Sequence, residues 1–258
     1  MINYMIATVL AILLGQVVSH LIRRLPEIIE DEDAIKKLIP TLKTGFKIDI
    51  WYSLVLVVLF NLTIYFVGFN YLSYIYMVII AMLVVALVID FRMQLIPDTV
   101  QVVVFLAGII ITAIDYTNWL GHILGMILGG IIFLLIAGFS KLVFRKEGMG
   151  MGDIKLMTGL GLVFGMKGLP TGFMDFFANA EVILTITVIA FFLAAIVAVL
   201  LIITKKTEKS QYMAFGPYIV IATILVMFFG TEIFLDVYFN TCTWLANIIT
   251  DFMFKVIN

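Results

Sequence analysis

The sequence predicts an all-α polytopic membrane protein, and three observations support that fold class. Hydrophobic residues make up 64% of the 258 residues, and charged residues make up only 13%. The mean hydropathy is +1.19, which is more apolar than a soluble domain of this length needs to be. Several apolar runs reach the length of about 20 residues that a helix needs to cross a bilayer. We therefore expect about eight transmembrane helices, separated by short loops.

Eight apolar segments follow one another along the chain. The predicted segments are 4–22, 50–67, 72–90, 99–115, 119–141, 154–172, 181–204 and 213–236. The sixth contains Gly159, Gly161, Gly165 and Gly168, and small residues are common where membrane helices pack closely. The first segment has no basic residues in front of it, so we expect a retained helix and not a cleaved signal peptide.

Basic residues are concentrated in alternate loops. Of the 16 lysines and arginines, 14 follow the first, third, fifth and seventh segments. By the positive-inside rule these loops are cytoplasmic, and both termini lie outside. We expect residues 1–49 to form a first helix with its cytoplasmic loop, and residues 50–258 to form a membrane-embedded domain.

Several common site chemistries find no support in the sequence. Cys242 is the single cysteine, so disulfides, cysteine-ligated zinc and iron–sulfur clusters within the chain are excluded. The two histidines, His20 and His122, are predicted on opposite faces of the membrane, and no HExxH is present. No Gly-x-Ser-x-Gly or P-loop occurs. The net charge of −1 gives no indication of a nucleic-acid partner. We expect no metal site.

Two aspartates stand at the ends of apolar segments on the same predicted face. Asp90 closes the third segment after an uninterrupted apolar run, and Asp153 opens the sixth. Each has an ordinary structural interpretation. Asp90 could face water and pair with Arg92, and Asp153 could be an N-cap that stabilises its helix by about 1 kcal/mol. Ionisable residues on membrane segments are costly and tend to be functional, so two such acids on one face indicate a joint role.

Two carboxyl groups held close together share one proton, because both cannot ionise cheaply side by side. One can then act as general base on water while the other donates a proton to a peptide carbonyl or leaving amine. Asp153 follows the stretch GMGMG, which contains Gly150 and Gly152. Glycines without a Cβ allow a close approach of backbones, and an extended substrate could pair there as an added strand. This pattern predicts an aspartic peptidase.

The same residues resemble the type IV prepilin peptidase family, membrane aspartic proteases of the GxGD class. The run 150–153 matches the GxGD signature, and Asp90 followed by LIPD at 95–98 is similar to the first catalytic aspartate and its downstream step. AFGPYI at 214–219 and GQVVSHLIRRLPE at 15–27 are similar to further family segments. The matches occur in the expected order over roughly residues 12 to 235.

The resemblance implies an enzyme that removes the short basic leader from type IV prepilins and pseudopilins on the cytoplasmic side of the inner or plasma membrane. It implies that Asp90 and Asp153 are the catalytic pair and that no cofactor is needed for cleavage. Gly150, Gly152, Lys155 and Pro97 are expected to shape the loop or contact substrate. For Lys155 we favour snorkelling of its ammonium to the membrane interface over contact with the leader.

Many bacterial members also methylate the new N-terminus with S-adenosylmethionine, and their first loop carries two CxxC pairs. Here that loop contains no cysteine, so residues 1–49 resemble a reduced form of the methyltransferase-like region. Methylation, and with it the need for S-adenosylmethionine, stays open.

Three alternatives also stay open. One is an archaeal-type peptidase that processes preflagellin-like precursors, although the bacterial-like match at 15–27 argues against it. Another is a transporter with functional carboxylates and glycine-broken helices, although both aspartates are predicted at the membrane edge. The third is a peptidase-like protein that acts mainly as a methyltransferase, although no nucleotide-binding glycine motif is present. The oligomeric state cannot be deduced from these patterns.

Overall fold

A computed structural model describes residues 2–30, 50–144, 149–204, 214–237, 240 and 243. Within these residues every regular element is a helix and no strand occurs. The elements are α1 (Ile2–Glu30), α3 (Ile50–Val67), α4 (Tyr71–Met93), α5 (Asp98–Ile114), η1 (Tyr116–Asn118), α6 (Trp119–Phe144), α7 (Met151–Phe164), α8 (Phe173–Asn179), α9 (Glu181–Ile203) and α10 (Gly216–Phe229).

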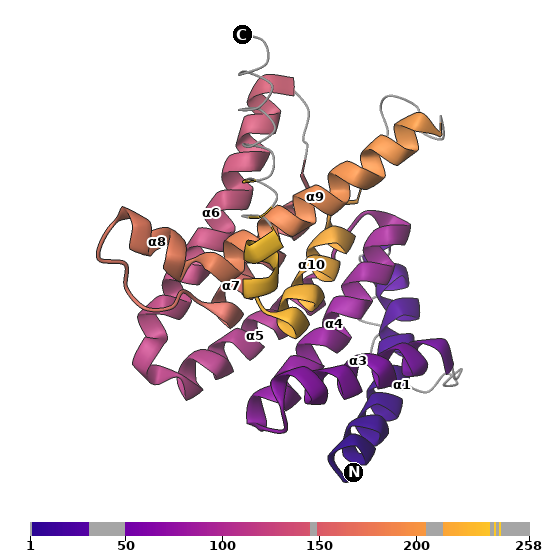
Figure 1. Cartoon of the computed structure of the whole chain (residues 1–258). Coiled ribbons are helices and arrows are strands. Elements are labelled where there is room, and N and C mark those ends of the chain that lie inside the picture. The colour runs from indigo at the N-terminus through magenta and orange to yellow at the C-terminus, as the bar shows by residue number, and fades with distance from the viewer. Residues whose placement is uncertain are drawn as a thin grey trace, which may run out of the picture.

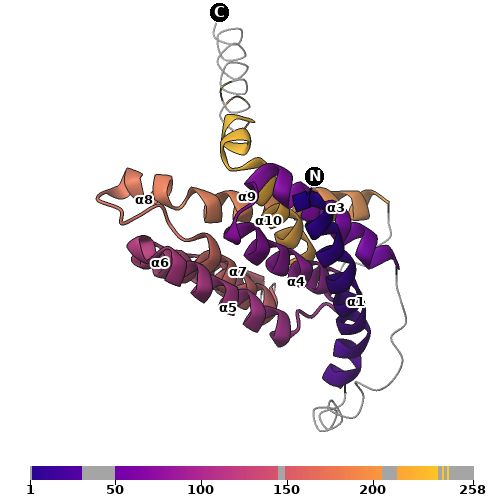
Figure 2. The ribbon, with the colours of Figure 1, turned by 90° about the horizontal axis from the view of Figure 1, so that it is seen from below.

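The helices form two groups that meet at α4 and α5 (Figures 1 and 2). α7 packs between α5 and α6, and these three helices make up one group. α1, α3, α4, α9 and α10 make up the other, with α10 against both α4 and α9. The short α8 lies at the periphery. α4 contacts α1, α3, α5 and α10, so it is the central helix of the bundle.

α4 is central because its sequence is apolar around its whole circumference. Its buried residues include Ile79, Ile80, Leu83 and Val85, which are fully enclosed, and a helix that is apolar all round is suited to burial on every side. Its start is fixed by Asn70, whose side chain accepts a hydrogen bond from the backbone N–H of Ser73 at 2.9 Å. The same helix therefore carries its last turn, with Asp90, into the interior of the molecule.

Glycines bring α6 and α7 into backbone contact. A Cβ on Gly125 would lie 2.5 Å from the carbonyl oxygen of Gly161, and a Cβ on Gly161 would overlap the backbone of Gly125 in turn. The expected close packing around the glycines of the sixth segment is thus confirmed at Gly161. The crossing fixes the position of α7 and hence of its first turn, where Asp153 lies.

The predicted all-α membrane class is confirmed, and each of the eight apolar segments contains an α-helix. Five of the described helices are long and apolar enough to cross a membrane, namely those at 2–25, 50–67, 71–93, 116–142 and 181–203. The count of eight crossings and the orientation with both termini outside stay predictions.

Two predicted segments have different limits in the structure. The sixth, expected over 154–172, is a helix over Met151–Phe164. It ends there because Gly165 adopts a φ of +64°. The eighth, expected over 213–236, forms α10 over Gly216–Phe229 and ends at Gly230, with a φ of +72°. Positive φ values are accessible to glycine at little cost, so these residues terminate the helices.

Some predictions concern segments outside the described residues. These are the loop at 31–49, the basic residues at 145–146 and 205–209, and the C-terminal tail with Cys242. The proposed division at residue 49 stays a prediction. Before that division, α1 packs against α3 and α4.

Candidate active site

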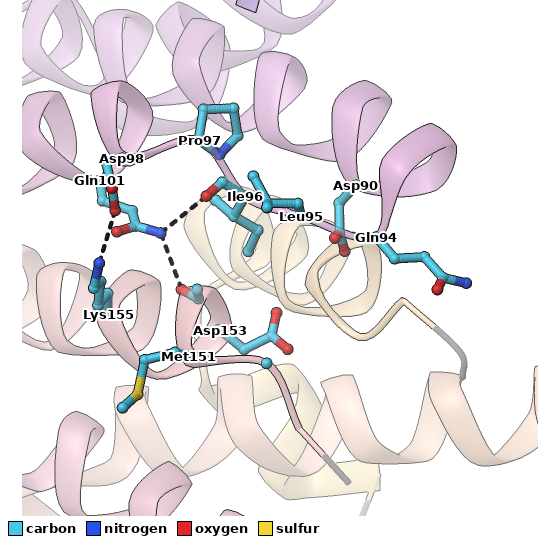
Figure 3. A pocket seen from close by; sticks show the side chains of 12 residues that line it. Asp90, Gln94, Leu95, Ile96, Pro97, Asp98, Gln101, Met151, Asp153 and Lys155 are labelled. Carbon is cyan, nitrogen blue, oxygen red and sulfur yellow. Dashed lines mark hydrogen bonds and ion pairs between the residues drawn. The ribbon is translucent and has the colours of Figure 1, made fainter. Parts of the chain in front are cut away.

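A pocket of about 430 Å³ opens where the end of α4, the start of α5 and the start of α7 meet (Figure 3). Its lining residues are Asp90, Gln94, Leu95, Ile96, Pro97, Asp98, Gln101, Gly150, Met151, Gly152, Asp153 and Lys155. The lining thus contains all six residues that the sequence singled out: Asp90, Pro97, Gly150, Gly152, Asp153 and Lys155.

Asp90 lies in the last turn of α4 and is only 4% exposed. The helix ends directly afterwards, because Gln94 adopts a left-handed conformation with φ 54° and its N–H closes the turn on the carbonyl oxygen of Asp90 at 2.9 Å. The Oδ2 atom of Asp90 is buried and makes no hydrogen bond of normal geometry with the described residues, although the backbone N–H of Gly216 is close enough to interact with this carboxyl group. A poorly paired buried carboxyl oxygen is costly, which makes Asp90 a candidate for a functional role.

Asp153 lies in the first turn of α7 and is 6% exposed. Gly150, not Asp153, occupies the N-cap position. Burial raises the pKa of the Asp153 carboxyl most, the negative charge of Asp90 also raises it, and the backbone N–H of Gly150 lowers it, which gives a pKa of about 7. At neutral pH this carboxyl can therefore hold or release a proton.

The two carboxyl groups point toward each other across the pocket (Figure 3). They come from helices in different groups of the bundle, and they are close enough for the charge of Asp90 to disfavour ionisation of Asp153. Such a pair can hold one proton between two acids, which is the state that general acid–base catalysis on water requires.

Two glycines allow backbone to lie against this pair. A Cβ on Gly152 would lie 3.1 Å from the Cβ of Ile96, so a larger residue would require the 94–97 connection and α7 to separate by a few tenths of an ångström. A Cβ on Gly216, at the start of α10, would lie 2.6 Å from Oδ2 of Asp90. Gly150 is less enclosed, since the nearest atom to a Cβ there would be Oδ2 of Asp153, at 3.5 Å.

Two polar contacts join α5 to α7 beside the carboxyl groups (Figure 3). The side-chain amide of Gln101 donates to the carbonyl oxygens of Ile96 at 3.2 Å and of Gly152 at 3.5 Å. Lys155 Nζ lies 2.7 Å from Oδ1 of Asp98, and both side chains are more than half exposed. The ammonium of Lys155 is thus held in an ion pair at the rim of the pocket.

The ordinary interpretations of the two aspartates are wrong. Asp90 is buried and forms no ion pair with Arg92, which is exposed, and Asp153 is not the N-cap. Gln101 and Gly216 were not expected as site residues from the sequence. A lone glutamine in the apolar run TVQVVVF was a signal for the first, and the glycine before Pro217 was a signal for the second.

Within the described residues, no group of three or more His, Cys, Asp or Glu side chains could hold a metal ion. His122 is buried near Asp115, and both lie in a different pocket, formed at the other ends of α4, α5 and α7. The arrangement around Asp90 and Asp153 therefore offers its chemistry through two carboxyl groups.

Comparisons with known proteins point to the same region. Residues 77–203 match the model of the type IV leader peptidase family. A protein from Xanthomonas campestris pv. campestris named prepilin leader peptidase/N-methyltransferase is 28% identical over 167 residues, which is 64% of this chain and 53% of the relative. Proteins of the same name from Pseudomonas putida (29% over 149 residues; 57% of this chain, 46% of the relative) and Neisseria gonorrhoeae (25% over 180 residues; 68% and 57%) also match.

The chain spans about half the length of the curated relatives it matches. No solved structure matches it significantly. The match to the family model includes α7 with its GxGD run and the last turn of α4. Residues 77–203 of this chain, which match the type IV leader peptidase family, contain both aspartates.

Proposed function

We propose that the protein is an aspartic endopeptidase that removes the leader peptide of type IV prepilins and pseudopilins. The observation that carries the proposal is the pairing of Asp90 and Asp153, two buried carboxyl groups that face each other in one pocket without a basic partner among the described residues. The match of residues 77–203 to the type IV leader peptidase family supports the choice of substrate.

In the proposed reaction the pair begins with one shared proton. The ionised carboxylate removes a proton from a water molecule as the water oxygen attacks the scissile carbonyl carbon. The protonated carboxyl donates its proton to the carbonyl oxygen, which gives a tetrahedral diol. As the carbon–nitrogen bond breaks, the first carboxyl gives its proton to the leaving nitrogen and the second carboxylate takes a proton from a diol hydroxyl, so the pair again holds one proton. Neither aspartate is assigned the base in advance, because such a pair titrates as a unit.

The loop around the pair suits an extended peptide. Gly150 has little around it, so a substrate backbone can approach the start of α7. The main chain at 94–97, which ends in Pro97, forms the opposite wall of the pocket. Pairing of a peptide with an exposed main-chain segment provides affinity with little demand on side chains, which fits an enzyme that accepts several related precursors.

The membrane setting of the reaction rests on the charge pattern of the sequence. The excess of basic residues in alternate loops supports an active site at the cytoplasmic face of the inner or plasma membrane. A membrane-embedded peptidase suits a precursor whose leader precedes an apolar helix, with lipid surrounding both. The distribution of charge, not the packing, carries this part of the proposal.

Methylation of the new N-terminus is a second activity to test. The relatives named above are peptidase/N-methyltransferases, but the first loop here has no cysteine pairs. If the activity is present, S-adenosylmethionine supplies the methyl group. The cleavage mechanism uses no such donor.

The experiment is cleavage of a purified type IV prepilin in detergent or lipid, read by mass spectrometry with and without S-adenosylmethionine. We expect loss of the leader with wild-type protein and no product with Asp90→Asn or Asp153→Asn. Asp115→Asn provides the matched control, since Asp115 lies in the other pocket, and should cleave normally. Cleavage that survives either active-site substitution contradicts the proposal, and a gain of 14 Da in the product reports methylation.

A further inference from the structure

Gln101 occupies an unusual position beside the aspartate pair. It lies on α5 and is 8% exposed, within an otherwise apolar stretch of that helix. A buried amide that leaves its N–H groups unsatisfied costs about 1–3 kcal/mol. Here the amide nitrogen faces two carbonyl oxygens, those of Ile96 at 3.2 Å and Gly152 at 3.5 Å (Figure 3). A primary amide has two N–H donors, so each carbonyl can take one.

The two carbonyls belong to the chain segments that carry the two aspartates. Ile96 lies in the 94–97 connection that leaves the last turn of α4, where Asp90 lies. Gly152 directly precedes Asp153 in the first turn of α7. One side chain on a third helix therefore joins the backbone after Asp90 to the backbone before Asp153.

The absent side chain of Gly152 makes this bridge possible. A Cβ at position 152 would lie 3.4 Å from the amide nitrogen of Gln101 and 3.1 Å from the Cβ of Ile96. The distance to Ile96 is tighter than ordinary van der Waals contact for a Cβ, and the distance to Gln101 is at its lower limit. A larger residue would therefore require a shift of a few tenths of an ångström between Ile96 and the start of α7.

We propose that Gln101 is a positioning residue that fixes the separation of Asp90 and Asp153 by holding the Ile96 and Gly152 carbonyls together. This inference rests on the proposed peptidase function. It assigns to Gln101 no contact with substrate. Errors of about 1 Å in the placement of reacting groups can cost about 100-fold in rate, so the residue should act on the chemical step more than on substrate binding.

The first test replaces Gln101 with methionine, which has similar length and no donor. We expect kcat for prepilin cleavage to fall by roughly 10- to 100-fold while KM stays within about threefold of the wild-type value. A kcat within about twofold of wild type overturns the inference. A fall in kcat/KM caused by KM alone also overturns it, since a positioning residue does not act that way.

Gln101→Glu tests the donor role by pH. An ionised glutamate has no hydrogen-bond donor for the two carbonyl oxygens, whereas a protonated glutamate has a single O–H that can donate to one of them. Relative to wild type at the same pH, Gln101→Glu should match Gln101→Met at pH 7.5 and exceed it at least about fivefold at pH 5.5. Equal relative losses at both pH values would indicate a packing role only and would overturn the inference.

Gln16 provides a matched control. Its side-chain amide donates to the hydroxyl of Ser53 at 3.1 Å, where α1 packs against α3, away from the pocket. Gln16→Met and Gln16→Glu should leave kcat within about twofold of wild type at both pH values. A similar pH-dependent recovery in the Gln16 variants would overturn the inference, because the effect would then not be specific to the pocket.

A measurement without substrate separates this inference from the proposed function. In a double-mutant cycle of thermal unfolding, Gly152→Ala should lower the midpoint less when Gln101 is already methionine, with a difference of about 2 °C or more. Additive effects would overturn the bridge even if cleavage is confirmed. If wild-type protein cleaves no prepilin, or Asp153→Asn still does, the proposed function fails while a coupled cycle still supports the bridge.

Discussion

The acidic residues at the two ends of α4, α5 and α7 have different kinds of neighbours. At one end these helices form the pocket with Asp90 and Asp153, and at the other they form a second pocket of about 300 Å³ that contains Asp115 and His122. At this second end the Nδ1 atom of His122 donates to the carbonyl oxygen of Leu162 at 2.8 Å, and its Nε2 atom lies 3.4 Å from Oδ2 of Asp115.

At the start of α9, as in the second pocket, the acidic residue has a polar or basic partner. Glu181 accepts hydrogen bonds from Lys167 and Thr231, both at 2.5 Å. These contacts join the segment after α7, the first turn of α9 and the residues after α10. Here an acid with a 19% exposed side chain has a cation and a hydroxyl as partners.

The difference teaches how to separate structural from functional acids in this molecule. Acids such as Glu181 have partners that offset the cost of desolvation. Asp90 and Asp153 are more buried, and each faces another acid. Stability alone does not require that arrangement, so it supports the proposed chemical role of the pair. Substitutions at the two ends should therefore affect different measurements.

The largest effect on activity is expected at Gly216, which lies against the carboxyl group of Asp90. In Gly216→Ala the new Cβ would lie 2.6 Å from Oδ2 of Asp90 and 2.9 Å from Cδ1 of Ile96, so the carboxyl group must move. We expect kcat for prepilin cleavage to fall by about 100-fold. Gly138→Ala on α6 is the control, because a Cβ there meets nothing within 4 Å. A Gly216→Ala enzyme with kcat near the wild-type value would show that the carboxyl tolerates displacement.

Much of this site could be predicted because its signals are local. Apolar runs located the helices, and acids at the ends of two runs located Asp90 and Asp153. The pairing itself followed from loop charge, since that pattern assigned both acids to one face. Gly152 could be predicted as a point of close approach, although the groups it approaches, Ile96 and Gln101, could not.

The features of the site and fold that could not be predicted depend on contacts between residues distant in sequence. Nothing around Gln101 indicates that its amide reaches a carbonyl 51 residues later. Likewise Gly216 and Asp90 meet only because α10 packs on α4. α7 ends early because the chain turns at Gly165. The mainly apolar run that continues to residue 172 had predicted a longer helix. Composition cannot distinguish a glycine that packs inside a helix, such as Gly161, from one that ends it.

At the start of α9 we expect a substitution to change stability but not activity. Glu181→Ala leaves the ammonium of Lys167 and the hydroxyl of Thr231 without their shared acceptor. Because hydrogen bonds to charged groups contribute about 1.5–3 kcal/mol, the unfolding free energy should fall by about 2 kcal/mol. Chemical denaturation would measure it, and kcat should stay within about twofold. A large loss of kcat with intact stability would place function at this end as well.

The pH dependence of stability should differ between wild type and Asp153→Asn. The folded pKa of Asp153 is raised from 3.8 to about 7, so the folded state holds a proton that the unfolded state releases. The associated stability is fully present below about pH 4 and is lost as pH rises through 7. Asp153→Asn removes this dependence, so its stability relative to wild type should increase by about 2–3 kcal/mol between pH 5 and pH 8.

The control for this titration is Gly138→Ala, which adds no titratable group, so its stability difference from wild type should stay constant over the same range. A constant difference for Asp153→Asn as well would mean that the folded protein does not hold the proton on this carboxyl. Cleavage should decline above pH 7 for the same reason, since the pair then loses its shared proton.

The smallest effect is expected at the exposed ion pair on the rim of the pocket. Lys155 and Asp98 lie 2.7 Å apart, but their side chains are 54% and 77% exposed, and exposed pairs contribute about 0–1 kcal/mol. A double-mutant cycle with Lys155→Met and Asp98→Asn should give a coupling of at most about 1 kcal/mol, weaker still in 0.5 M salt. If Lys155 serves only this pair, KM for prepilin should change less than about twofold in Lys155→Met. A larger change in KM, retained in high salt, would instead assign Lys155 to contact with the substrate and extend the functional end of the molecule to the rim.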